Sequence, residues 1–124
     1  MLKIHARKLG DVTILCLKGR IVVGENKTLR NAVLSQSDVS LLVLDLSGVT
    51  RIDASGLGVL LELREQTHSK GIEFRLMNVT KLVEQVLEIT CLNSVFEISS
   101  EGEVLSRVSR ALAAAIVEAA APFA

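Results

Sequence analysis

The sequence predicts one α/β domain: a mixed, mostly parallel β-sheet with an antiparallel hairpin at its N-terminal end and about four packed helices. Three observations predict this fold. Residues 3–18 have the pattern of a hairpin, the run LLVLDL at 41–46 is apolar enough for a central strand, and four other segments have the pattern of helices. The 124 residues suffice for one core and are too few for two domains.

The N-terminal hairpin follows from alternating polarity. Lys3, His5 and Arg7 alternate with apolar residues, as in an edge strand with one solvated face. Gly10 and Asp11 offer a tight turn, and residues 12–18 are apolar on both faces, as inside a sheet. Because His5 falls on the charged face of the edge strand, we interpret it as a solvated residue.

The middle of the chain predicts a helix from about Glu25, a central strand at 41–46, a helix at 55–69 and a half-exposed strand at 72–76. Gly71 stands where a helix-terminating glycine is expected. The strand at 41–46, the helix at 55–69 and the strand at 72–76 make a strand-helix-strand unit, whose crossover should be right-handed.

The remaining elements begin at helix-capping residues. Thr80 is placed to cap a helix with an apolar face, and a short strand is expected at 95–98. Ser100 and Glu103 have capping-box spacing before a final helix, which should run to about Ala119. This helix is expected to pack on the sheet through residues at helical spacing: Val104, Leu105, Val108, Leu112, Ala115 and Ile116. The domain thus spans 1–124, with a core at about 3–110, an alanine-rich helix end and tail at 111–124, and Pro122 as the helix stop.

Composition argues against several classes of function. Fourteen basic and fourteen acidic residues cancel, and three Phe with no Trp or Tyr leave few stacking platforms, so direct nucleic-acid binding is not expected. The N-terminus resembles no secretory signal, and no apolar run reaches about 18 residues, so we expect a cytoplasmic protein without membrane insertion. Cys16 and Cys91 lack metal-ligand spacing, so neither a metal nor a disulfide is predicted.

A small polar segment, residues 53–56 (DASG), separates the central strand from the next helix. Enzyme motifs do not fit it. A phosphate-binding loop needs a lysine where Val59 follows Gly58, and a nucleophile elbow needs glycines at positions 53 and 57. His68 is 13 residues along the same helix, about 20 Å from Ser55 at 1.5 Å per residue. His5, the only other histidine, could reach Ser55 only if the edge strand passed the site, and with few other polar residues available catalysis is not predicted.

The segment does suit the start of a helix. The hydroxyl of Ser55 can cap the backbone N–H of Leu57 or Gly58, which is a purely structural role. Gly56 and Gly58 remove side chains from the first turn and so should open access to Ser55. Leu57 and Val59 make that turn apolar; Val59, Leu60 and Leu63 are expected in the core, whereas Leu57 could face either the core or a partner.

Two aspartates are candidates for support of the same segment. Asp53 could hold the loop by accepting backbone N–H groups, orient Ser55, or recruit a cation. Asp45, in the apolar strand, is expected to tie down the loop from below.

Residues 41–63, LLVLDLSGVTRIDASGLGVLLEL, resemble the signature region of STAS domains of the anti-sigma factor antagonist type. The resemblance implies a small, non-enzymatic, cytoplasmic protein with no cofactor. It implies that Ser55 is phosphorylated by an anti-sigma factor serine kinase and dephosphorylated by a PP2C-type phosphatase. The unphosphorylated form would bind the anti-sigma factor and release the sigma factor.

The resemblance also implies a partner-binding surface around Ser55. It consists of Asp53, Ala54, Gly56, Leu57, Gly58 and Val22. Val22 stands near a position where many antagonists carry an acidic residue that contacts the kinase. A second interpretation is a STAS subunit of a lipid-transport ABC complex or of a stressosome-like assembly, and a homodimer is left open.

Overall fold

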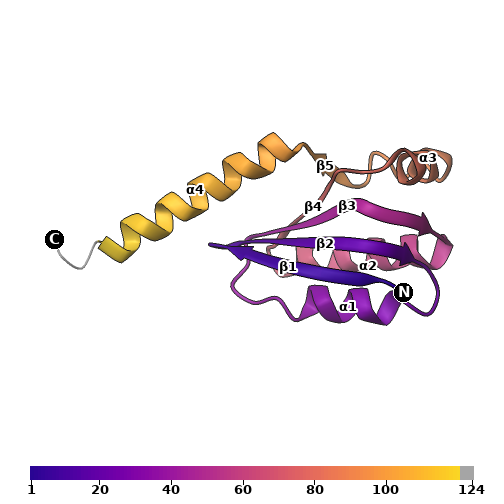
Figure 1. Cartoon of the computed structure of the whole chain (residues 1–124), viewed down its shortest axis with the longest axis horizontal. Helices are drawn as coiled ribbons and strands as arrows, with labels where there is room; N and C mark the ends of the chain where they lie inside the picture. The colour runs from indigo at the N-terminus through magenta and orange to yellow at the C-terminus, as the bar shows by residue number, and fades with distance from the viewer. Residues whose placement is uncertain (121–124) are drawn as a thin grey trace.

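The computed structural model describes residues 1–120 and shows a five-stranded mixed sheet with helices on both faces (Figure 1). The strands lie in the order β1-β2-β3-β4-β5. Only β1 and β2 are antiparallel, and the other pairs are parallel, as predicted. Along the chain the elements are β1 (Lys3–Leu9), β2 (Val12–Ile21), α1 (Asn26–Leu34), β3 (Leu41–Ile52), α2 (Ala54–Ser69), β4 (Glu73–Met77), α3 (Lys81–Ile89), β5 (Glu97–Ser99) and α4 (Glu101–Ala120).

The predicted turns and helix ends are confirmed at several points. Gly10 makes the hairpin turn with φ at 66°, and Gly71 follows α2 with φ at 74°, a region that favours glycine. The Thr80 hydroxyl accepts a hydrogen bond from Val83 N at the start of α3. Ser100 and Glu103 form the reciprocal capping box of α4.

The central strand β3 is longer than its sequence indicated. The predicted end of this strand at residue 46 was wrong, because β3 continues to Ile52 and pairs there with the end of β2. Two register shifts, opposite residues 16–18 and 19–20 of β2, absorb the extra residues of β3 as bulges. Gly48 fits here because a Cβ would lie 2.8 Å from the Leu17 carbonyl oxygen. The extension carries β3 to Ile52, directly before residues 53–56.

The sheet has a core on each face. The larger core joins the sheet to α1, α2 and α3, and it includes Leu29, Leu44, Leu60, Leu63 and Val83. The smaller core lies under the first half of α4 and consists of Val12, Leu41, Val43, Met77, Val104 and Val108. Because α2 is fixed by the larger core, its N-terminus is held in place at the end of β3.

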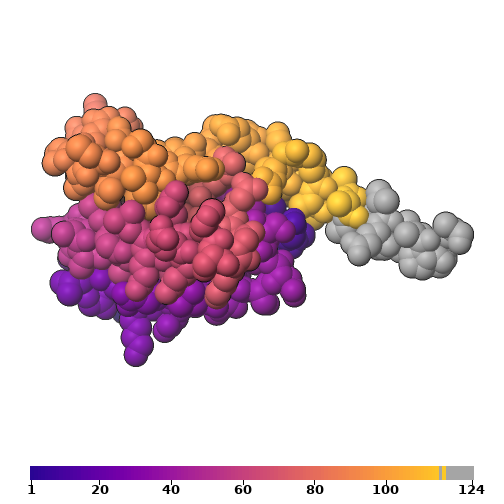
Figure 2. All heavy atoms as spheres, turned by 180° about the vertical axis from the view of Figure 1, so that it is seen from behind, coloured from indigo at the N-terminus to yellow at the C-terminus, as the bar shows by residue number. Residues whose placement is uncertain are grey.

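Helix α4 packs on the sheet less than its apolar residues predicted. Val104 and Val108 are buried, but Leu105, Leu112 and Ile116 are 62 %, 41 % and 69 % exposed. The helix continues past the sheet, as its orange-to-yellow ribbon in Figure 1 and the spheres of the same colours in Figure 2 show, so the sheet no longer lies beneath Leu112 and Ile116. Leu105 lies between the buried Val104 and Val108, and its exposure places it on the side of α4 away from the sheet. The Pro122 prediction falls outside the described residues. The strand expected at 95–98 is β5, displaced to Glu97–Ser99.

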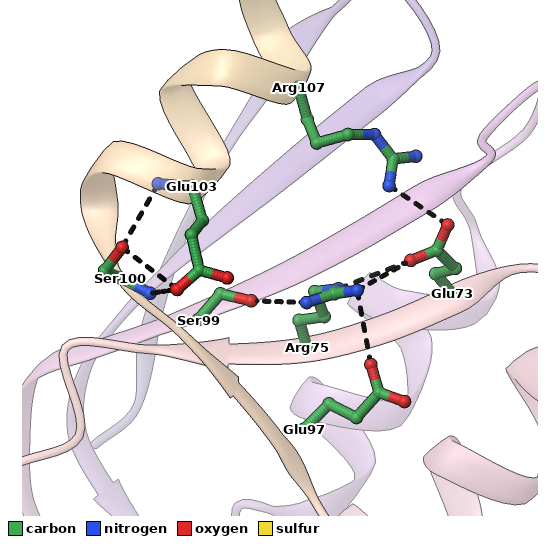
Figure 3. A network of polar contacts seen from close by, with 7 residues as sticks. All are labelled: Glu73, Arg75, Glu97, Ser99, Ser100, Glu103 and Arg107. Atoms are coloured by element: carbon green, nitrogen blue, oxygen red, sulfur yellow. Dashed lines mark hydrogen bonds and ion pairs between the residues drawn. The ribbon is translucent and has the colours of Figure 1, made fainter.

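A polar network fixes the first half of α4 to the sheet (Figure 3). The Glu73 carboxylate accepts hydrogen bonds from Arg75 on β4 and from Arg107 on α4, the latter at 3.1 Å. Arg75 also donates to the Ser99 hydroxyl at 2.8 Å and pairs with Glu97. Partial burial raises the pKa of Glu73, but Arg107 and Arg75 outweigh it and hold that pKa below its ordinary value.

Candidate functional site

The candidate site lies where β3 passes into α2, at the carboxyl end of neighbouring parallel strands. Ile52 ends β3 opposite Ile21, the last residue of β2. Asp53 is extended, with φ at −113° and ψ at −179°, and Ala54 is the first helical residue. The end of β2, the segment after it and the start of α2 therefore meet here, as in other parallel sheets, in which loops at the carboxyl ends of strands form sites.

Asp53 is the N-cap of α2, and this corrects the prediction that Ser55 caps the helix. Its Oδ1 accepts a hydrogen bond from Gly56 N at 2.8 Å, and its Oδ2 accepts one from Val23 N at 3.1 Å. A capping residue must be extended and precede the first turn, whereas Ser55 already lies within that turn. Asp53 therefore joins α2 to the segment after β2, which confirms its loop-holding role.

Ser55 is exposed, and hydrogen bonds fix its hydroxyl on two sides. Its Oγ donates to Asp53 Oδ1 at 2.7 Å and accepts from Asn26 Nδ2 at 3.2 Å. These bonds come from two different elements, the N-cap of α2 and the first residue of α1. The site therefore presents one oriented hydroxyl to solvent.

The carboxylate of Asp53 is the charged group nearest to this hydroxyl. Hydrogen bonds from the Ser55 hydroxyl, then from Gly56 N and Val23 N, stabilise the ionised form and hold the pKa of Asp53 below its ordinary value. The site thus keeps a negative charge at neutral pH.

The two glycines of the first turn have different roles. A Cβ on Gly56 would lie 2.1 Å from the Ile21 carbonyl oxygen, so this glycine allows α2 to approach β2. The expectation that Gly56 opens a path to Ser55 was therefore wrong. A Cβ on Gly58 would meet no described heavy atom within 4 Å, and Gly58 is exposed. Leu57 is only 5 % exposed, so its side chain belongs to the core. Of these three, Gly58 leaves the approach to Ser55 open.

The rim of the site is partly apolar. Ala54 is exposed beside Ser55, Val22 is half-buried, and Val23 is 75 % exposed. Val23 N donates a hydrogen bond to Asp53, so Val22 and Val23 lie next to the start of α2. Neither Asn26 nor Val23 was predicted to belong to the site. The signal that could have found them was their position after β2, which ends at the same edge of the sheet as β3.

Asp45 supports a different region from the one predicted. Its Oδ1 accepts hydrogen bonds from Ser47 N at 3.0 Å and Asn78 Nδ2 at 3.2 Å. Asp45 thus holds the bulged part of β3 and the connection after β4, because β3 continues for seven residues beyond it. Its Oδ2 lies 3.9 Å from Cys16 Sγ. Partial burial, followed by the charge of Asp45, raises the pKa of the Cys16 thiol.

The two histidines of the chain, His5 and His68, are not near Ser55. His5 pairs with Cys16, five residues before the end of β2, or about 17 Å along a strand. His68 is in the last turn of α2, at the opposite end of the helix from Ser55. Neither is placed to remove the Ser55 proton. Within residues 1–120, no helix combines the length and apolar character needed to cross a membrane.

Comparison with known proteins agrees with this architecture. The sequence profile of the STAS domain matches residues 3–111. The chain belongs to the STAS domain family. Its fold is also that of solved structures. A crystal structure of an anti-sigma factor antagonist from Mycobacterium paratuberculosis has a TM-score of 0.75 at 20 % identity, with 88 % of this chain and 95 % of that chain covered.

Two other structures show the range of proteins that share this fold. The Bacillus cell fate determinant SpoIIAA in its phosphorylated form has a TM-score of 0.65 at 16 % identity, covering 86 % of this chain and 99 % of that one. A sulfate transporter family protein from Wolinella succinogenes has a TM-score of 0.66 at 21 % identity, covering 85 % and 89 %. At these identities the likeness establishes the SpoIIAA-like STAS fold.

The hydrogen bonds of Asp53 predict a pH dependence of stability. Its pKa is lowered in the folded state relative to 3.8, so the unfolded chain binds more protons in acid. The stabilisation by Asp53 should be present at neutral pH and be lost as pH falls through its folded-state pKa. The Asp53→Asn variant keeps a capping oxygen but has no charge to lose at this position. Urea unfolding of wild type and variant from pH 7 to pH 3 should therefore give free energies that converge below about pH 4. A constant difference would contradict this role.

Proposed function

We propose that this chain is an anti-sigma factor antagonist, a cytoplasmic protein whose binding to an anti-sigma factor is switched by phosphorylation of Ser55. The observation that carries the proposal is the geometry of Ser55. Its hydroxyl is exposed, oriented by Asp53 and Asn26, and mounted on a helix that the core holds in place. Membership of the STAS family and the shared fold of an antagonist and of phosphorylated SpoIIAA support the same interpretation.

The switch needs one phosphoryl transfer in each direction. The γ-phosphoryl group of ATP bound to the partner kinase moves to Ser55 Oγ: the Oγ–P bond forms, the P–O bond to ADP breaks, and the hydroxyl proton is released. A PP2C-type phosphatase then hydrolyses the ester with water. The ATP belongs to the kinase, so the chain itself needs no cofactor and no catalytic residue.

The surface around Ser55 suits a protein partner. Ala54, Gly58 and Val23 are exposed, and together they give small or apolar contacts around one polar group. Phosphorylation adds about −1.5 to −2 charges at the centre of this surface. The first turn of α2 can receive this charge, since helix N-termini carry partial positive charge. In this proposal Gly56 and Leu57 act indirectly, by positioning the surface from below.

Ser55→Ala should abolish labelling by the cognate kinase with radioactive ATP, because the variant lacks the accepting oxygen. The matched control is Ser100→Ala. Ser100 is also an exposed serine at a helix start, but its hydroxyl caps α4 by accepting from Glu103 N. Ser100→Ala should keep full labelling. A pull-down from native lysate with and without ATP, followed by mass spectrometry of Ser55, identifies the kinase. Full labelling of Ser55→Ala would refute the proposal.

A second candidate function is that of a regulatory or structural subunit of a transport complex. The shared fold of a sulfate transporter family protein favours it. This alternative covers a lipid-transport ABC complex and a stressosome-like assembly. Under it, the pull-down should recover the same partners with and without ATP, and Ser55 should stay unmodified. Capture of a kinase that dissociates when ATP is supplied distinguishes the antagonist from the subunit.

A further inference from the structure

Asn26 contacts the Ser55 hydroxyl from another element of the fold. It is the first residue of α1, and its Nδ2 donates to Ser55 Oγ at 3.2 Å. The other half of the amide, Oδ1, is buried and has no hydrogen-bond partner among the described residues. Burial of an unpaired oxygen is unfavourable. The hydrogen bond to Ser55 is therefore the favourable polar contact that the Asn26 amide makes among the described residues.

We propose that Asn26 positions the Ser55 hydroxyl before phosphorylation and receives the phosphate afterwards. This inference rests on the proposed phosphorylation of Ser55, and it adds a residue whose contact with position 55 differs between the two states. Asn26 is a positioning residue in the first state and a phosphate-binding residue in the second.

Before phosphorylation, Asn26 fixes the orientation of the attacking oxygen. A serine hydroxyl has one hydrogen and two lone pairs. In this site the hydrogen points to Asp53 Oδ1, and one lone pair accepts from Asn26 Nδ2. One lone pair is left to attack the γ-phosphorus of ATP. Removal of the Asn26 amide would let the hydroxyl rotate, and so fewer encounters with the kinase would have the attacking lone pair in place.

After phosphorylation, the contact with Asp53 becomes unfavourable. The new Oγ–P bond replaces the O–H bond, so Oγ can no longer donate to Asp53 Oδ1, and two acceptors would face each other at 2.7 Å. Asp53 stays in place because Gly56 N and Val23 N also bind it. The phosphorylated side chain should therefore turn away from Asp53 and toward the donor on its other side, Asn26 Nδ2.

The start of α1 strengthens Asn26 as the receiving group. The residue before it, Glu25, is the N-cap, but its side chain makes no capping hydrogen bond within the described chain. The backbone hydrogen bond from Leu29 N to Glu25 O is long, at 3.4 Å. Two carboxylates belong to this region: Asp53, which accepts from the Ser55 hydroxyl, and Glu25, whose carboxylate lies 3.6 Å from the amino group of Met1. A phosphate at Asn26 would therefore have an amide donor and a helix N-terminus beside it.

The test uses protein with phosphoserine encoded at position 55, which needs no kinase. A ³¹P NMR titration measures the second pKa of that phosphate. Because a donor stabilises the dianion, Asn26→Ala should raise this pKa by about half a unit. Asn26→Asp should raise it by about one unit or more, because a carboxylate replaces the donor. The matched control is Asn31→Ala, which removes an exposed asparagine farther along α1 and should leave the value unchanged.

The two proposals can fail separately. Equal phosphate pKa values in wild type, Asn26→Ala and Asn26→Asp, with matching melting temperatures, would overturn the role of Asn26 whatever the kinase does. Absence of kinase labelling at Ser55 in wild-type protein would refute the proposed function and leave the titration informative. Once the kinase is identified, Asn26→Ala should also slow labelling of Ser55 by about threefold to tenfold relative to Asn31→Ala. An unchanged labelling rate would refute the proposed positioning of the Ser55 hydroxyl by Asn26.

Discussion

Gly56→Ala should lower the free energy of unfolding by about 3 kcal/mol, which is a large fraction of the stability of a domain this size. The added Cβ would lie 2.1 Å from the Ile21 carbonyl oxygen and 2.9 Å from the carbonyl carbon and Cγ2 of the same residue. Most of this obstacle is backbone of a paired strand, which cannot rotate away. Alanine gains about 1 kcal/mol of helix propensity over glycine, and this offsets only a small part of the strain.

Gly58→Ala, two residues along the same helix, should have the opposite sign. Its Cβ would enter open space among the described residues, so only the helix propensity changes, and stability should rise by about 1 kcal/mol. Urea unfolding of both variants measures the pair, with unchanged m-values expected because the unfolded surface is the same. If both substitutions shift stability in the same direction, α2 does not approach β2 as closely as described.

Local sequence patterns were sufficient to predict most of the fold. The hairpin follows from alternation and from Gly10, and the caps at Thr80 and Ser100 follow from residue type and spacing. Each of these features depends on atoms within a few residues of one another. The same holds for α2, whose end at Ser69 was predicted from Gly71.

The errors lie where distant segments decide the structure. Residues 47–51 include Ser47, Gly48 and Thr50, as a turn often does, yet pairing with the far end of β2 keeps them in a strand. The polarity of the first turn of α2 indicated the site, but the choice of Asp53 over Ser55 as cap depends on backbone angles. Gly56 resembled an access glycine because nothing nearby in sequence reveals the Ile21 carbonyl.

The contact between Asn26 and Ser55 had no local signal, since the residues are 29 positions apart. It follows from topology: β2 and β3 are parallel neighbours, so the residues that follow them meet at one edge. The exposed side of α4 is a related case. Helical spacing identifies an apolar face, but only the position of the helix relative to the sheet determines how much of that face is covered.

Phosphorylation of Ser55 should change the stability of the domain by only about 1 kcal/mol in either direction. The helix N-terminus favours the new negative charge, typically by about 0.3 to 1 kcal/mol. The ionised Asp53 opposes it, but solvent screens both charges because the site is exposed. Thermal melts of protein with serine or phosphoserine at position 55 measure this difference. Unfolding of the phosphorylated domain would show that the platform is not rigid.

If the proposed function holds, affinity for the anti-sigma factor should respond to phosphorylation far more strongly than stability does. Inside an interface the phosphate is removed from water and faces a surface that accepts a neutral hydroxyl, so binding should weaken by about 2 kcal/mol or more, roughly thirtyfold. Ser55→Ala is neutral, and should keep its affinity within about threefold, because it removes a small hydroxyl without adding charge. Calorimetric titration of the three forms against the partner compares them directly. On a rigid platform, phosphorylation changes only the charge and size of the group at position 55. If the phosphoserine and serine forms bind the partner with affinities within twofold of each other, Ser55 is therefore not a charge switch.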